Sequence, residues 1–155
     1  MEGPPLWHRL LAGLAYLLPW SDSISFGASL FRMFPVLQYL QLPALPLLLL
    51  ERSIPFGGLV LFLVLFVAVV RNTKVPYAVR FNVLQAILID IVLVLLQLAF
   101  QILLSPFGGG FMTRTLSNAV FLGTLLLVMF AIIQCLRGKE ADIPTVSEAV
   151  RMQIQ

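Results

Sequence analysis

The chain has 155 residues, of which 60% are apolar and 11% are charged, and its mean hydropathy is +1.00. Soluble domains average about 45–50% apolar and about 25% charged residues, so this chain lacks the charges that a water-facing surface needs. We therefore expect an all-α, polytopic membrane protein with no soluble domain. The net charge of +3 fits the excess of Lys and Arg that membrane proteins keep in cytoplasmic loops, and no nucleic-acid partner is expected.

The first predicted span covers residues 6–20 and carries Trp7 and Trp20 near its two ends, where tryptophan favours the bilayer interfaces. The order of charge and then apolar run resembles a secretory signal, but no small-residue cleavage site follows, so we expect a retained helix. Residues 21–27 are predicted as a turn. The chain shows no long Ser- and Arg-rich leader, which favours a bacterial, organelle-encoded or mature protein.

The next apolar stretch, residues 26–50, is broken by Arg32, Pro35, Pro43 and Pro46. Each proline removes a backbone hydrogen bond that lipid cannot replace, so one straight span is excluded. The prediction is an interfacial helix near residues 26–40, followed by a half-helix that ends at residue 50.

Three further spans follow, and the whole chain, residues 1–155, is predicted as one membrane domain with four transmembrane helices. Pro76 is expected to open the third of these helices, and the glycine-rich residues 105–110 form a turn that no helix would tolerate. The tail has apolar residues on one side of a helix and is expected to lie on the membrane surface. The three spans are residues 54–70, 81–104 and 115–136, and the tail is residues 142–155.

The basic residues predict the orientation, because cytoplasmic loops carry the excess of Lys and Arg. With these spans, seven basic residues share one side and three lie on the other, which places both termini in the cytoplasm or, in a plastid, the stroma. The first group is Arg9, Arg71, Lys74, Arg80, Arg137, Lys139 and Arg151; the second is Arg32, Arg52 and Arg114.

Familiar catalytic constellations are missing from the sequence. The single histidine, His8, excludes a two-histidine zinc helix, and the single cysteine, Cys135, excludes an intramolecular disulfide. Of the seven acidic residues only Asp90 lies inside a predicted span, which excludes an intramembrane aspartate pair. We therefore expect no enzyme, no catalytic residue, no cofactor and no metal site.

A polar stripe runs along the third span. Asp90, Gln97 and Gln101 fall on one face of the helix, with Asn82 and Gln85 near its cytoplasmic end. Such groups are costly against lipid, so the stripe faces protein or water and either joins helices together or lines a path. The expected partners of Asp90 are a neutral donor such as Asn118, water in a cavity, or a group on another subunit.

Five short stretches between the helices, in their order and spacing, resemble the Tic-twenty family, the small four-helix subunit of the translocon at the inner envelope membrane of chloroplasts. The resemblance covers nearly the whole chain and favours the cyanobacterial or plastid-encoded branch. It implies that Asp90 stands where plant members carry an acidic residue, and that Asn82 stands where they carry His. The stretches are Phe34-Pro35-Val36-Leu37, Ser53-Ile54-Pro55-Phe56-Gly57-Gly58, Val70-Arg71-Asn72, Val79-Arg80-Phe81-Asn82-Val83 and Ala141-Asp142-Ile143-Pro144.

By this resemblance the protein is expected to be a subunit of a protein-import complex in a cyanobacterial inner membrane or a plastid inner envelope membrane, and to contribute to a polypeptide-conducting channel. Its expected partners are other membrane subunits, a passenger polypeptide and the lipid bilayer, and self-association stays open. The alternatives are a small-solute channel or carrier, and a structural subunit of a larger membrane complex.

Overall fold

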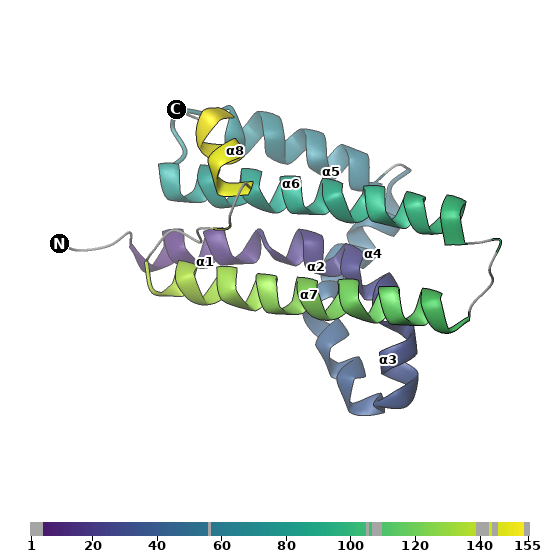
Figure 1. Cartoon of the computed structure of the whole chain (residues 1–155). Helices are drawn as coiled ribbons and strands as arrows, with labels where there is room; N and C mark the ends of the chain where they lie inside the picture. Colours follow the sequence, from purple (N-terminus) through teal and green to yellow (C-terminus); the bar gives the residue numbers. More distant parts are fainter. Residues whose placement is uncertain are drawn as a thin grey trace.

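The computed structural model describes residues 5–55, 57–104, 106, 110–138, 143 and 146–153, and all regular structure within them is helical. The predicted all-α class is therefore confirmed. The N-terminal helices α1 (Leu6–Leu14) and α2 (Leu17–Ser23) lie between two long helices, α6 (Tyr77–Ala99) and α7 (Phe111–Leu136), and pack against both (Figure 1).

Helices α1 and α2 follow one another with little change of course, because Ala15 and Tyr16 between them keep right-handed helical dihedral angles. Together they cover residues 6–23, about 27 Å of helix. The predicted turn at residues 21–27 is wrong: α2 runs on to Ser23 and the 3₁₀ turn η1 (Ile24–Gly27) continues it. The hydroxyls of Ser21 and Ser23 donate to carbonyl oxygens three residues earlier, at 2.8 and 2.7 Å, so both serines are satisfied within the helix.

The proline-rich stretch forms three short helical pieces: α3 (Ala28–Met33), the 3₁₀ segment η2 (Pro35–Ala44) and α4 (Leu45–Ser53). The single interfacial helix predicted over residues 26–40 is therefore wrong, since the chain breaks at Phe34. Phe34 has extended dihedral angles (φ −129°, ψ 84°), as expected for a residue before a proline. The predicted half-helix corresponds to α4.

The second apolar helix starts later than predicted, at Gly57 instead of residue 54. It comprises α5 (Gly57–Leu65) and a π-helical turn η3 (Phe66–Val70), and it ends at residue 70 as expected. The helical segments Pro35–Ser53 and Gly57–Val70 meet at 107°, which makes them either a broken span or a re-entrant loop.

Two helices of the described chain are long and apolar enough to cross a membrane by themselves, and a bent pair would make a third. They are Tyr77–Leu104, formed by α6 and the π-helical η4 (Phe100–Leu104), and Phe111–Leu136. Both begin four residues earlier than predicted; Pro76 does precede the first turn of α6. The predicted turn at residues 105–110 falls largely outside the described residues.

Large apolar side chains remain exposed along the long helices, for example Val67 on η3, Ile102 on η4 and Leu126 on α7, which are 65%, 72% and 69% exposed. Exposure of such an apolar surface to water is unfavourable, whereas a lipid bilayer solvates it. The fold therefore agrees with a membrane location.

The core of the bundle is aromatic where α2, α3 and α7 meet. The ring of Phe121 lies 5.3 Å from those of Trp20 and Phe31, and the Trp20 indole donates to the carbonyl of Leu40 at 2.9 Å. Gly27 makes this packing possible, because a Cβ there would lie 2.8 Å from the Phe121 ring. The irregular segments are thus anchored on α7.

One end of the bundle gathers the start of α1, residues 71–76 and the last helix, α8 (Val146–Gln153), which packs on α6 (Figure 1). Two arginines bind helix C-termini at this end: Arg9 donates to the carbonyl of Leu136 and Arg80 to that of Val70, at 3.3 and 2.9 Å. Val150 of α8 is fully buried. The start of the tail lies outside the described residues, and its contact with a membrane surface stays a prediction.

Candidate functional site: a polar seam along α6

Polar side chains of α6 and of the helical segments packed around it form what we call the polar seam. Its proximal half lies toward the chain termini, and its distal half lies toward the opposite end of the bundle. The proximal half comprises Tyr16, Asn82, Gln85, Cys135 and Ser147; the distal half comprises Asp22, Ser25, Glu51, Asp90, Gln97 and Gln101.

The proximal half is a directed chain of hydrogen bonds. The amide of Ile143 donates to the Ser147 hydroxyl at 2.8 Å, and that hydroxyl donates to the side-chain oxygen of Gln85. The Gln85 amide nitrogen donates to the Tyr16 hydroxyl at 2.8 Å, which in turn donates to Asn82 Oδ1 at 2.6 Å. The side-chain amide nitrogen of Asn82 donates to the carbonyl oxygen of Ala78 at 2.7 Å.

This chain of hydrogen bonds connects α8, α6 and Tyr16 between α1 and α2, and α7 joins it where Cys135 Sγ donates to Asn82 Oδ1 at 3.3 Å. Tyr16, Gln85 and Ser147 are fully buried. Buried polar networks whose members are all paired rigidify a fold, whereas half-paired ones are costly. The hydrogen bonds of Asn82 and Gln85 connect α6 to α7, to α8 and to the segment between α1 and α2.

The distal half brings acidic groups together. Asp90 of α6 lies close to Asp22 of α2, and Glu51 of α4 is close enough to interact electrostatically with both. The sequence argument against a pair of acidic residues at this depth is therefore wrong, since it placed Asp22 in a turn outside the helix.

Several oxygens of this region are buried without a hydrogen-bond partner among the described residues: Glu51 Oε1, Asp90 Oδ1 and, on α7, Asn118 Oδ1. A fourth, Gln134 Oε1, lies nearer the other end of α7. Asp90 lies near Asp22, and its expected pairing with Asn118 stays a prediction. A buried oxygen without a hydrogen-bond partner is unfavourable, so we expect water, a proton or a group on a further subunit to satisfy these oxygens.

Gln97 and Gln101 lie beside a cavity of about 280 Å³ between η1, the end of α6 and α7. Gln97 donates to the backbone oxygen of Asp22 at 3.0 Å and to the Ser25 hydroxyl at 2.9 Å, whereas Gln101 is exposed. Ser117 of α7 completes the polar lining. The cavity has both the room and the polar groups that ordered water requires.

Sequence reasoning found the α6 residues of the seam but missed their partners. The sequence does not distinguish Tyr16 from a core residue, because it is an aromatic residue in an apolar run. Ser147 lies beyond the last predicted span, so the sequence gives no reason to place it beside α6. Within the described residues, no three His, Cys, Asp or Glu side chains are placed to hold a metal ion. The described residues of the seam are thus joined by hydrogen bonds.

Comparison with known proteins agrees with this architecture. The family model described as "Chloroplast import apparatus Tic20-like" matches residues 1–150. A "Tic20 family protein" of Synechocystis is 43% identical over 95% of this chain and 92% of its own length. "Protein TIC 20-II, chloroplastic" of Arabidopsis thaliana is 34% identical over 97% and 74%, and "Tic20 family protein Ycf60" of Porphyra purpurea is 32% identical over 94% and 75%. The chain therefore belongs to the Tic20 family, as the motifs between its helices indicated.

Proposed function

We propose that this chain is a membrane subunit of a protein-translocation complex and that the distal half of its polar seam borders the route of the passenger polypeptide. Family membership supports the first part, since the description of the family model names the chloroplast import apparatus. The second part depends mainly on one observation: Gln101 is exposed and lines a polar cavity at the end of α6.

The contrast between the two halves of the seam supports this assignment. Among the described residues the polar groups of the proximal half hydrogen-bond one another, so they are engaged within the chain. The distal half keeps unpaired oxygens on Asp90 and Glu51. Backbone amides of an extended polypeptide are donors that could satisfy such oxygens, and so could water beside it.

We also propose four spans with both termini on the cytoplasmic or stromal side. The start of α1, residues 71–76 and α8 lie at one end of the bundle, which an even number of crossings produces (Figure 1). The first span would combine α1 and α2, and the second would be α5 with η3. The basic residues at this end, including Arg9 and Arg80, agree with that orientation.

The experiment is site-specific photocrosslinking in the assembled complex. A photoreactive residue at Gln101 should capture a passenger polypeptide arrested in transit, whereas the same residue at Leu126, on the lipid-facing side of α7, should not. Equal capture at the two positions, or none at Gln101, would remove the seam from the route.

A solute channel or carrier is the alternative from another functional class. It predicts flux of a small solute through liposomes that contain this chain alone, and it needs no partner subunits. A purely structural subunit predicts neither flux nor crosslinks. The polar cavity beside Gln97 and Gln101 fits both transport alternatives, so flux measured without partners separates them from each other.

A further inference from the structure

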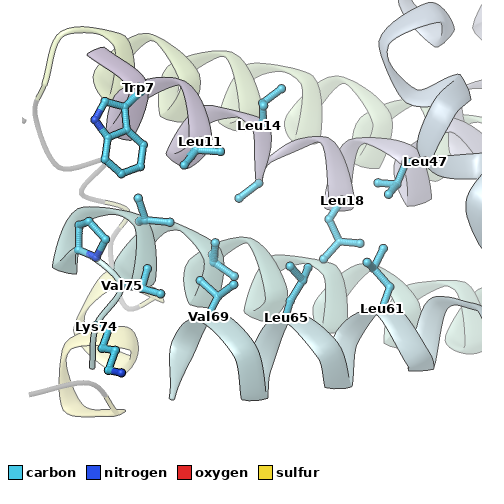
Figure 2. Close-up of a pocket in the computed structure, with 14 residues that line it drawn as sticks. Trp7, Leu11, Leu14, Leu18, Leu47, Leu61, Leu65, Val69, Lys74 and Val75 are labelled. Carbon is cyan, nitrogen blue, oxygen red and sulfur yellow. The ribbon is translucent and has the colours of Figure 1, made fainter. Parts of the chain in front are cut away.

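A second and larger cavity lies apart from the polar seam. It has a volume of about 580 Å³ and runs between α1–α2 on one side and α5–η3 on the other, with α6 as its floor (Figure 2). We call it the apolar groove. Leu14 and Leu18 line one wall and Leu61, Leu65 and Val69 line the other.

The lining changes character along the groove. Trp7 and Lys74 lie at one end, and Leu47 and Leu61 lie at the other (Figure 2). Lys74 is the single charged residue among those that line it, and its side chain is exposed. The groove is therefore apolar along its length and basic at the end of the bundle where the chain begins.

Such a lining excludes water as the occupant, because a water molecule needs two to four polar partners. The volume is about four times that of an apolar cavity of ~150 Å³ that takes up benzene. An unbranched alkyl chain fits a long apolar slot between helices, and the bilayer around this protein supplies such chains in excess. A cation and an interfacial tryptophan at one end match a phospholipid headgroup with negative charge.

We propose that the apolar groove binds one acyl chain of an anionic phospholipid whose headgroup is held at Lys74. The lipid then packs between α1 and α5 and joins the N-terminal helices to the second apolar helix. This site is separate from the proposed passenger route and does not depend on it.

The test is native mass spectrometry of the full-length protein released from nanodiscs that contain equal amounts of phosphatidylglycerol and phosphatidylcholine. Wild-type protein should retain one phosphatidylglycerol. Leu65→Trp fills the groove and should abolish retention, whereas Leu63→Trp, two residues along on the exposed face of α5, should leave it unchanged. Leu14→Trp and its control Leu10→Trp test the opposite wall independently, in case Leu65→Trp impairs folding.

The headgroup contact is tested by Lys74→Gln, which should lower the preference for phosphatidylglycerol about fivefold, in line with the attraction of one basic side chain to anionic lipid. Arg71→Gln, in the same loop but outside the groove, is the control. Equal retention of lipid by Leu65→Trp, Leu14→Trp and wild type would overturn the proposal. So would a wild-type dimer that Leu65→Trp converts to a monomer, since a second copy would then occupy the groove.

Discussion

Gly57 approaches the backbone of α4 so closely that a Cβ atom at this position would overlap the carbonyl oxygen of Glu51. The corner between α4 and α5 therefore requires glycine. We expect Gly57→Ala to lower the free energy of unfolding by about 1–3 kcal/mol, because the overlap is with backbone and cannot be relieved by a rotamer change. Reversible unfolding of the protein in mixed micelles measures this.

The neighbouring glycine provides the control. Nothing lies within 4 Å of a Cβ placed on Gly58, so Gly58→Ala should leave stability unchanged or raise it slightly through the better helix propensity of alanine. Equal effects of the two substitutions would mean that the corner is not held as tightly as the structure shows.

The buried hydroxyl of Tyr16 links Asn82 to Gln85 through bonds of 2.6 and 2.8 Å. Tyr16→Phe removes it and leaves the Gln85 donor without its partner, which should cost about 1–3 kcal/mol of unfolding free energy. Tyr39→Phe is the control, because Tyr39 is 69% exposed. An unchanged stability for Tyr16→Phe would show that water replaces the hydroxyl within the network.

Long, predominantly apolar runs made α6 and α7 predictable, because about twenty predominantly apolar residues form a helix across the bilayer. Their starting points were less predictable. The polar residues before Phe81 and Thr115 predict loops, whereas the structure places them in the first turns of α6 and α7. A membrane helix can extend into the interface, where polar side chains meet water, so hydropathy alone sets its ends too far inward.

The errors around Asp22 have a different cause. Ser, Asp and Ser in succession are typical of a turn, but here Ser21 and Ser23 bond back to the helix and are buried. The packing of α2 between α6 and α7 therefore outweighs the local propensity of these residues for a turn. Because Asp22 was placed outside the helix, its contact with Asp90 could not be foreseen; such a pairing is a property of the tertiary arrangement.

The tail shows that an amphipathic pattern does not identify what covers its apolar face. Val150 is fully buried and belongs to the same cluster as Phe81 of α6, and the Arg151 guanidinium lies 5.4 Å from the centre of that ring. A membrane surface and a neighbouring helix require the same spacing of apolar residues.

The proposed orientation predicts that residues 71–76 face the cytoplasm or stroma. In a Cys135→Ser background, a cysteine at Thr73, which is exposed, should react with a membrane-impermeant maleimide only from that side. A cysteine at Gly110, which precedes α7 at the opposite end, should react only from the other side. The reverse pattern would invert the topology, and reaction of both from one side would exclude an odd number of crossings between them.

The contact between Asp22 and Asp90 gives the sharpest test of the distal half of the seam. We expect Asp90→Asn and Asp90→Leu both to reduce passenger transport while the complex stays intact on a native gel, because the unpaired oxygen at Asp90 would serve the route and not the assembly. Asp22→Asn should do the same, and the double variant Asp22→Asn with Asp90→Asn should be no worse than either alone, since the effects of residues that act as one unit are not additive.

Gln134→Leu is the control: it removes a comparable unpaired oxygen from α7 nearer its C-terminal end and should leave transport unchanged. Normal transport in Asp90→Asn together with lost assembly in Asp90→Leu would instead make the pair a structural contact. Normal transport and assembly in Asp90→Leu would show that the pair has no role. An acidic group near the middle of a span costs about 2.5–3.5 kcal/mol on insertion, so its replacement by leucine would then only make insertion more favourable.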